Sequence, residues 1–193
     1  MSGVRRKIVV VGDGGCGKTS MLLVYAKGEF PSVYVPTVFE NFITSVELDG
    51  ASIELAVWDT AGQEEYDRLR PLSYPNTHIL LLCYSMDSPG SLSNITAKWA
   101  PEVKHFCPGV PTMLIGCKID LRGNAAVQKE MDDNHLGKMP TTEEGQKVAA
   151  EIQAIHHMEC SALKGTGIKE VFELATRESL VSRKKKKSPC VIF

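Results

Sequence analysis

A glycine-rich run between an apolar segment and a helical pattern is the first group of residues that could do chemistry. It reads GDGGCGKT over residues 12–19 and matches the pattern GxxxxGK[ST]. Glycines let successive backbone N–H groups converge on phosphate oxygens, and the start of the following helix adds the positive end of its dipole. There Lys18 would bridge the β- and γ-phosphates, and Thr19 would ligate Mg²⁺. The run predicts a nucleoside-triphosphate site rather than a chance glycine-rich turn.

A second motif, DTAGQ at residues 59–63, follows a predicted strand. Asp59 is placed to act as a carboxylate on the metal side, Gly62 to offer a backbone N–H to the γ-phosphate, and Gln63 to orient a water molecule. A helix-capping aspartate followed by turn residues is the alternative interpretation. The motif favours hydrolysis of the nucleotide.

Two further loops indicate which base is bound. The run CKID at residues 117–120 follows a strand, and the carboxylate of Asp120 can accept the N1 and N2 hydrogens of guanine, which adenine does not offer. The run CSA at residues 160–162 follows the last predicted strand and supplies a backbone N–H for the guanine oxygen. Together the loops favour GTP over ATP.

The elements that must position these loops alternate along the chain. Residues 7–11 form a β-branched run that is apolar on both faces, as in a central parallel strand, and a helical pattern covers residues 18–27. Alternating segments flank Asp49-Gly50, which predicts an antiparallel hairpin. Later strands alternate with helices, so we expect an α/β fold: a mostly parallel six-stranded sheet with one antiparallel hairpin strand, helices on both faces, and ligand loops at the carboxyl ends of the strands. The later strands are expected at residues 79–83, 113–117 and 158–160.

Several local signals refine this picture. A helix carrying Leu92, Ile95, Trp99, Val103 and Phe106 should be kinked by Pro101. Trp99 is interpreted as a core residue rather than a binding residue. Thr141 and Glu144 form a predicted capping box, the polar segment 124–135 predicts a short inserted surface helix, and the pair at 156–157 is interpreted as surface or packing histidines that precede a strand.

Composition restricts the class of protein. The 193 residues are 43% hydrophobic and 23% charged, which indicates one globular domain with a tail and excludes a largely disordered chain or a coiled coil. No run reaches the roughly 20 apolar residues of a membrane-spanning helix. The six cysteines show no metal-ligand spacing, so reduced thiols are expected rather than zinc or a disulfide scaffold. They are Cys16, Cys83, Cys107, Cys117, Cys160 and Cys190.

The four loop motifs, in this order and spacing, resemble those of the Ras superfamily of small GTPases over nearly the whole chain. More narrowly, the chain resembles the Rho family through the stretch VYVPTVFEN at residues 33–41, the run WDTAGQEEYDRLRPL at 58–72 and the extra polar helix. The fold expected is therefore a P-loop NTPase G domain with a Rho-type insert helix. The GDGGCGKTS and GCKxDLR variants resemble the RhoD and Rif branch, whereas Trp58 resembles the RhoA branch.

The resemblance assigns roles to further residues. Thr37 would close switch I (residues 30–42) on Mg²⁺ and the γ-phosphate, Tyr34 would cover the nucleotide, and residues 61–76 would form switch II. Resemblance and motifs together imply Lys18, Gly62, Gln63 and Tyr34 as catalytic residues. The expected magnesium site is Thr19, Thr37 and, through a water molecule, Asp59. The expected GTP/GDP-binding residues are Gly12, Asp13, Gly14, Gly15, Cys16, Gly17, Lys18, Thr19, Ser20, Phe30, Tyr34, Pro36, Thr37, Asp59, Gly62, Lys118, Asp120, Ser161, Ala162 and Leu163.

Two positions depart from the family pattern. Gly15 stands where many Rho relatives have Ala, and Cys117 stands where the superfamily usually has Asn. A thiol is a weak hydrogen-bond partner. We therefore expect a looser link between the base loop and the phosphate loop, and faster nucleotide exchange.

The resemblance implies a monomeric molecular switch that hydrolyses GTP slowly and signals to effectors, with regulation of the actin cytoskeleton as the expected output. Exchange factors, GTPase-activating proteins, dissociation inhibitors and effectors would contact residues 34–42, from Tyr34 to Phe42, and residues 61–76, from Ala61 to Asn76. No arginine placed for catalysis is evident beside these segments, so an activating protein is expected to supply one. A GTP-bound scaffold with little hydrolysis and a P-loop nucleotide kinase stay open as alternatives.

The end of the chain carries two membrane signals. Cys190 begins a C-a-a-X motif whose final Phe favours geranylgeranylation. Arg183 and the lysines at 184–187 contribute five positive charges, so the net charge of −1 leaves residues 1–182 at −6. An acidic body argues against nucleic-acid binding, whereas a basic lipidated tail predicts attachment to the anionic cytoplasmic face of the cell membrane, with a cytosolic pool. We expect a G domain over 1–182, with its insert helix near 123–139, and a tail over 183–193.

Overall fold

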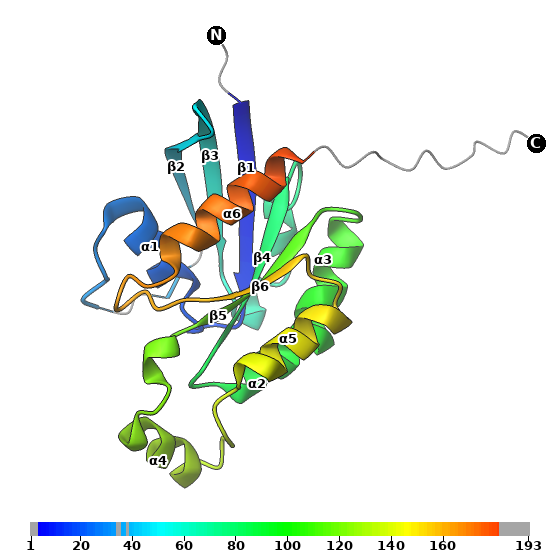
Figure 1. Cartoon of the computed structure of the whole chain (residues 1–193). Helices are drawn as coiled ribbons and strands as arrows, with labels where there is room; N and C mark the ends of the chain where they lie inside the picture. The colour runs from blue at the N-terminus through cyan, green and yellow to red at the C-terminus, as the bar shows by residue number, and fades with distance from the viewer. Residues whose placement is uncertain (1–3, 34–35, 38, 182–193) are drawn as a thin grey trace, which may run out of the picture.

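A computed structural model describes residues 4–33, 36–37 and 39–181. Its six strands form one sheet in the order β2-β3-β1-β4-β5-β6, and every neighbouring pair is parallel except β2 with β3. Helices cover both faces of this sheet (Figure 1), which confirms the predicted fold class. The strands are β1 (Val4–Gly12), β2 (Phe39–Leu48), β3 (Ala51–Thr60), β4 (Ile79–Ser85), β5 (Thr112–Cys117) and β6 (His156–Glu159). The α-helices are α1 (Lys18–Lys27), α2 (Pro89–Asn94), α3 (Ala100–Phe106), α4 (Ala125–Asp133), α5 (Thr142–Glu151) and α6 (Ile168–Leu180).

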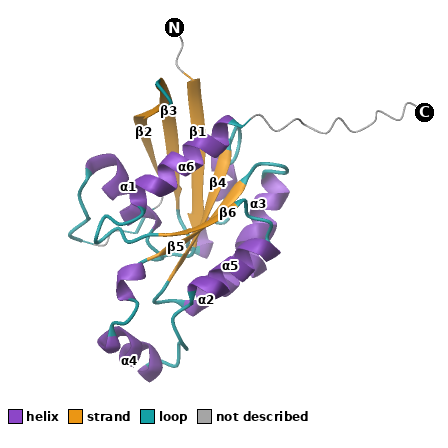
Figure 2. Ribbon diagram, in the orientation of Figure 1, coloured by secondary structure: helices purple, strands orange, loops and turns teal. Residues whose placement is uncertain are grey.

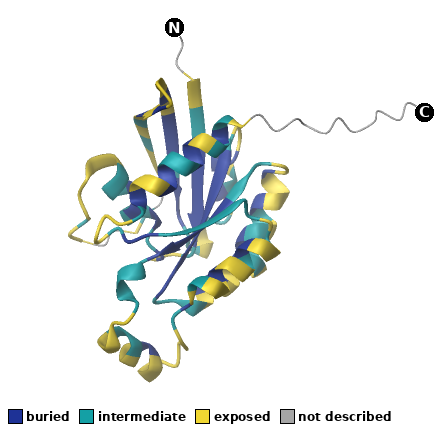
Figure 3. Ribbon diagram, viewed as in Figure 1, coloured by how far each residue is buried: buried dark blue, intermediate teal, exposed yellow. Residues whose placement is uncertain are grey.

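The two faces of the sheet bury separate halves of the core. Ile8 and Val10 of β1 pack with residues of α1 and α6, whereas Val9 and Val11 pack with residues of α2, α3 and α5. All four side chains are fully buried, and Figure 3 shows the inner strands as the most deeply buried part of the molecule. A strand buried on both faces must be apolar throughout, which explains the unbroken β-branched run.

The hairpin between β2 and β3 forms where the sequence predicts it. Asp49 and Gly50 both adopt positive φ angles, 51° and 79°, and Leu48 pairs with Ala51. A two-residue turn of this kind matches the right-handed twist of the strands it joins, and Asp-Gly tolerates its backbone conformation.

The helix around Pro101 runs without a break over residues 89–106, as predicted, but it is not α-helical throughout. A π-type segment, Ile95–Trp99, continues α2 directly into α3, and Pro101 is the second residue of α3. Proline has no N–H to donate within a helix, and the wider segment just before it is the local irregularity that accompanies it. Phe106, the last apolar residue of this pattern, is 46% exposed.

The last strand begins two residues earlier than predicted. His156 and His157 lie within β6, where Met113 of β5 pairs with His156. His156 Nε2 is 2.9 Å from a carboxylate oxygen of Glu178, and His157 Nε2 is 3.0 Å from the Tyr84 hydroxyl. Pairing with β5 therefore includes two histidines in the strand, although histidine as a residue type does not predict a strand.

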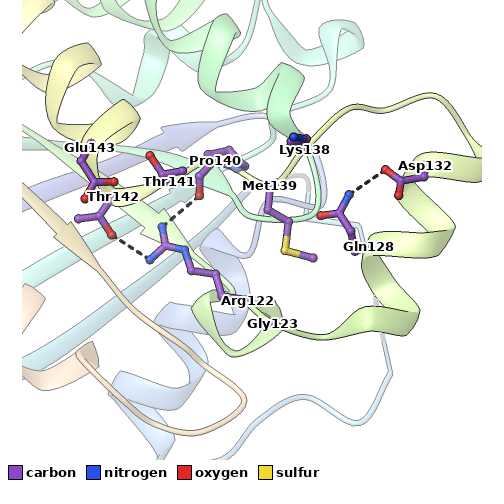
Figure 4. A pocket seen from close by; sticks show the side chains of 10 residues that line it. All are labelled: Arg122, Gly123, Gln128, Asp132, Lys138, Met139, Pro140, Thr141, Thr142 and Glu143. Atoms are coloured by element: carbon purple, nitrogen blue, oxygen red, sulfur yellow. Dashed lines mark hydrogen bonds between the residues drawn. The ribbon is translucent and has the colours of Figure 1, made fainter.

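The inserted helix α4 is confirmed and lies apart from the sheet (Figure 2). Its connection to the body runs through Arg122, which donates to Thr142 Oγ1 at 3.1 Å and to the Pro140 carbonyl at 3.2 Å (Figure 4). The same guanidinium makes two 2.6 Å bonds to the Glu159 carboxylate. One arginine thus ties both ends of the insertion to β6.

The start of α5 carries the predicted capping box. The Thr141 N–H donates to Glu144 Oε2 at 2.8 Å, and the Glu144 N–H donates to Thr141 Oγ1 at 3.2 Å. No helix in the described part of the chain has both the length and the apolar composition needed to cross a membrane.

Candidate functional site

The glycine-rich loop joins the end of β1 to the start of α1. Lys18 begins the helix, is 5% exposed, and its ammonium donates to the carbonyls of Gly12 at 2.8 Å and Asp13 at 2.7 Å. The lysine is therefore folded back over its own loop. A buried ammonium beside a helix N-terminus makes this a favourable place for an anion.

Three oxygen-bearing side chains meet beside the lysine. Thr19 Oγ1 donates to Asp59 Oδ2 at 2.6 Å and lies 2.6 Å from Thr37 Oγ1. Asp59 is fully buried at the end of β3, and its Oδ1 has no hydrogen-bond partner among the described residues. These hydroxyl and carboxylate oxygens are the donor types that Mg²⁺ prefers.

Burial sets the ionisation of the carboxylate. It raises the pKa of Asp59 to about 6, and the hydrogen bond from Thr19 and the positive charge of Lys18 offset only part of that rise. A buried carboxylate with one unpartnered oxygen is costly as an anion. A cation at this position would remove that cost.

Gly62 and Gln63 lie against the phosphate loop. A Cβ added to Gly62 would come within 2.3 Å of the Gly14 nitrogen, so only glycine allows this approach of the two backbones. A Cβ on Gly14 would lie 3.5 Å from Gln63 Cγ, in ordinary contact. The glutamine side chain therefore lies directly beside Gly14, and branches beyond a Cβ would crowd it.

A cavity of about 680 Å³ opens over this cluster. It contains the phosphate-loop lysine, the switch I threonine and the switch II glutamine. Its lining also includes residues that the sequence did not single out, among them Leu23, Lys27 and Glu40. The predicted residues in its wall are Gly14, Gly15, Gly17, Lys18, Thr19, Ser20, Phe30, Pro36, Thr37, Gly62, Gln63 and Lys118.

A smaller cavity of about 210 Å³ adjoins it at the ends of β5 and β6. Asp120, Ala162 and Leu163 line it, together with the thiols Cys117 and Cys160. The Ser161 hydroxyl donates to Asp120 Oδ1 at 2.5 Å. The two cavities share Gly17, Ser20, Phe30 and Lys118, so they form one continuous site.

Comparison with known proteins identifies the family to which this site belongs. The Ras family model matches residues 7–181. GTP-binding protein Rho1 of Kluyveromyces lactis is 55% identical over 190 residues, covering 98% of this chain and 90% of its own. GTP-binding proteins RHO1 of Candida albicans and Saccharomyces cerevisiae are 55% and 52% identical, and each alignment covers 98% of this chain and 96% of the relative.

The chain belongs to the Rho family of small GTPases, within the Ras superfamily. It is a GTP-binding switch protein that hydrolyses GTP, and neither the scaffold with little hydrolysis nor the nucleotide kinase is favoured. Proteins of this family act with regulators and effectors.

Not every predicted residue lines the cavities of this Rho-family GTPase. Gly12, Asp13, Asp59 and Ser161 are not among the residues that line them. The Cys16 thiol is buried and points to the Cys83 carbonyl at 3.6 Å. Tyr34 and Cys190 lie outside the described residues.

Trp99 does more than fill the core. Its ring is fully buried, as predicted, but its indole N–H donates to Asp13 Oδ1 at 2.7 Å. Asn94 Nδ2 donates to Asp13 Oδ2 at 2.7 Å. The phosphate loop is thus held through Asp13 to the helical segment that follows β4, a link that helical periodicity alone does not predict.

Switch II is held to the same segment by a buried arginine. The Arg70 guanidinium is fully buried and donates to the carbonyls of Ala61 at 3.0 Å and Gln63 at 3.3 Å. It also pairs with Asp67 at 2.7 Å and Glu102 at 2.9 Å. Its carbon centre lies 4.5 Å from the Trp99 ring centroid, so one tryptophan contacts the anchors of both nucleotide loops.

Removal of the Asp13 carboxylate should therefore loosen the phosphate loop. We expect Asp13→Ala to lower the free energy of unfolding by about 1–3 kcal/mol, because the buried indole N–H loses its acceptor, and to speed GDP release. Urea unfolding and release of a fluorescent GDP analogue measure the two effects. Asp13→Asn, which keeps an acceptor for Trp99, should retain most of the stability.

The matched control is Asn94→Ala, which removes only the exposed hydrogen bond to Asp13 and should change stability by less than about 0.5 kcal/mol. Equal losses in Asp13→Ala and Asn94→Ala would contradict the assigned role of the indole.

Proposed function

We propose that the two joined cavities hold GTP or GDP, with the phosphates over residues 12–20 and the guanine between Lys118, Asp120 and residues 161–163. The observation that carries this proposal is the continuity of the site. The ammonium of Lys18, the oxygens of Thr19 and Thr37, and the carboxylate of Asp120 face one continuous space. Their order along it matches the order of phosphates and base in a nucleotide.

Thr19, Thr37 and Asp59 would hold Mg²⁺ beside the phosphates, with Asp59 acting through water. The unpartnered Asp59 Oδ1 and the two 2.6 Å contacts at Thr19 support this assignment. In the described residues no three His, Cys, Asp or Glu side chains converge as ligands, so phosphate and water oxygens would complete the shell. Bound Mg²⁺ would neutralise negative charge on the phosphate oxygens.

Hydrolysis then depends on positioning and charge balance. Gln63 orients the attacking water, the Gly62 N–H and the Lys18 ammonium stabilise charge on the γ-phosphate, and Tyr34 covers the site. Arg70 of switch II donates to the Gln63 carbonyl, but its guanidinium is also paired with Asp67 and Glu102. A GTPase-activating protein therefore supplies the catalytic arginine.

Gln63→Leu tests the hydrolytic role. It should keep nucleotide affinity and lower the single-turnover GTP hydrolysis rate by about 100-fold, since misplacing a reacting group has effects of that order. Gln146→Leu, an exposed position on α5, is the control and should hydrolyse GTP normally. A Gln63→Leu variant with an unchanged rate would remove the glutamine from the mechanism.

Base recognition rests on Asp120. Its carboxylate accepts from the Ser161 hydroxyl and is available to accept the N1 and N2 hydrogens of guanine, while the backbone at Ser161 and Ala162 donates to the guanine oxygen. Lys118 is held by its 2.7 Å bond to Asp87 Oδ2 and lines both cavities. Guanine is thereby preferred to adenine.

Asp120→Asn should weaken GTP binding by roughly 10–100-fold, the effect of losing charge-assisted hydrogen bonds, and shift preference toward xanthine, whose 2-oxo group is an acceptor. Competition among GTP, XTP and ATP measures both changes. Asp133→Asn on the exposed face of α4 is the control. Tight ATP binding by the unchanged protein would contradict the assignment of the base pocket.

Residues 34–42 and 61–76 form the proposed surface for exchange factors, activating proteins, dissociation inhibitors and effectors. Leu69 and Leu72 are more than half exposed there and line an apolar cavity of about 320 Å³ with Trp58 and Tyr66. Exposed apolar side chains of this kind mark protein-binding surfaces. The acidic G domain does not favour nucleic acid, and the protein acts as a monomer, with cytoskeletal regulation as the proposed output.

The tail, residues 183–193, is proposed to attach the G domain, residues 1–182, to the cytoplasmic face of the cell membrane, with a cytosolic pool. This assignment comes from the sequence, because the tail lies outside the described residues. One lipid chain binds membranes only marginally, and each nearby Lys or Arg adds about 1 kcal/mol. Geranylgeranyl on Cys190 and the basic run are therefore required together.

Cys190→Ser should make the protein cytosolic in fractionated cells and leave GTP hydrolysis in solution unchanged. Replacing the lysines at 184–187 by Gln should weaken membrane association of the lipidated protein. Ser188→Ala is the control within the tail. Membrane pelleting of Cys190→Ser would show that this cysteine is not the anchor.

A further inference from the structure

Four buried free thiols gather below the base cavity, on the face of the sheet covered by α1 and α6. They belong to one core cluster: Cys16, Cys83, Cys117 and Cys160. Cys117 and Cys160 are 3% and 1% exposed, and both line the 210 Å³ cavity. A small solute that enters this cavity therefore reaches two neighbouring sulfurs.

The strand register places these two cysteines side by side. The Cys160 N–H donates to the Gly116 carbonyl at 2.8 Å, and the Cys160 carbonyl accepts from the Ile119 N–H at 3.3 Å. Cys160 directly follows β6, and these two bonds continue the parallel pairing, so Cys117 and Cys160 are neighbours at a strand spacing of about 4.8 Å. Disulfides form at Cα separations of about 4.4–6.8 Å.

Cys83 lies too far from Cys117 to meet this distance requirement for a disulfide. It pairs in register with Ile115, two residues before Cys117, which places it roughly 8 Å from Cys117 along the diagonal. The Cys160 thiol donates to the Met21 sulfur at 3.8 Å, and Cys83, Cys117 and Cys160 belong to the same buried cluster. Of Cys83 and Cys160, only Cys160 is placed to form a bond with Cys117 without movement of the backbone.

The surroundings also favour reaction at Cys117. Hydrogen bonds from the Cys160 and Cys83 thiols, with the positive charges of Lys18 and Lys118, hold the pKa of Cys117 well below its ordinary value of 9.0, although burial opposes this. The thiolate is the form of cysteine that attacks an oxidant.

We propose that Cys117 and Cys160 form a peroxide-sensitive dithiol site in the wall of the base cavity. The Cys117 sulfur attacks a hydroperoxide and breaks its O–O bond, giving a sulfenic acid and, with the proton lost by the thiol, water or an alcohol. The Cys160 sulfur then attacks the sulfenic sulfur, and the departing hydroxide leaves as water with the Cys160 proton. Two thiols become one disulfide, and one peroxide is reduced.

This site deepens the proposed function, and it rests on the assignment of the cavity to guanine. Cys117 directly precedes Lys118, and Cys160 directly precedes Ser161, so a bond between their sulfurs pulls on both base loops. A guanine bound in the cavity would cover the two thiols. Oxidation should therefore be fast in the nucleotide-free protein, slow in the GDP-bound protein, and should lower GDP affinity by at least tenfold until a reductant restores it.

The test exposes full-length protein, nucleotide-free or GDP-bound, to hydrogen peroxide. Remaining thiols are alkylated, and non-reducing digestion with mass spectrometry identifies the joined peptides. We expect a Cys117–Cys160 pair that dithiothreitol removes. In Cys160→Ser, a sulfenic acid at Cys117 should be trapped by dimedone. Cys107→Ser, on the opposite face of the sheet, should form the bridge as the unchanged protein does.

The outcomes separate the two proposals. A bridge between other cysteines, or full alkylation of Cys117 and Cys160 after peroxide, overturns the dithiol site. A bridge that forms equally fast with GDP bound overturns the cavity as the route of the oxidant. If the reduced protein does not bind GDP, the assignment of the cavity to guanine fails. Formation or absence of the Cys117–Cys160 disulfide in the nucleotide-free protein still tests the dithiol site independently.

Discussion

The buried carboxylate of Asp59 is the constraint around which the proposed nucleotide site is arranged. It is fully buried, one oxygen accepts from Thr19, and the other has no partner among the described residues. Such a group is costly as an anion unless a cation lies beside it. Thr19 contacts both Asp59 and Thr37. The hydrogen bonds of this one carboxylate therefore connect β3 with the phosphate-loop motif and switch I. The conformation of switch I is thereby linked to what occupies the site.

A second arrangement holds the loops from behind. Arg70 bonds to two carbonyls and to Asp67 of switch II and pairs with Glu102 of α3. The Trp99 indole donates to Asp13 of the phosphate loop, and its ring lies beside the Arg70 guanidinium. Buried charges are tolerated only when fully hydrogen-bonded, so this network resists partial rearrangement. Switch II and the phosphate loop therefore share one rigid support on the segment between β4 and β5, although neither belongs to it.

Local signals were enough for much of the fold and for most of the cavity wall. The hairpin at Asp49-Gly50, the capping box of Thr141 and Glu144, and the apolar run of β1 each depend on a few adjacent residues. The glycine-lysine motif likewise places its own lysine at a helix N-terminus, because strand, turn and helix are contiguous. Parallel strands then bring the loops after β1, β3, β5 and β6 to one edge of the sheet.

The sequence by itself determined the family and the order of the elements and was enough to propose the phosphate and base loops, because these depend on spacing along the chain. The tertiary structure alone decided which distant residues support them. Asp13 and Trp99 are 86 residues apart, and Cys117 meets Cys160 only through the pairing of β5 with β6. It also set the start of β6 and the π-type segment of the helix before Pro101. Such features depend on neighbours across the sheet, and local propensity carries no information about them.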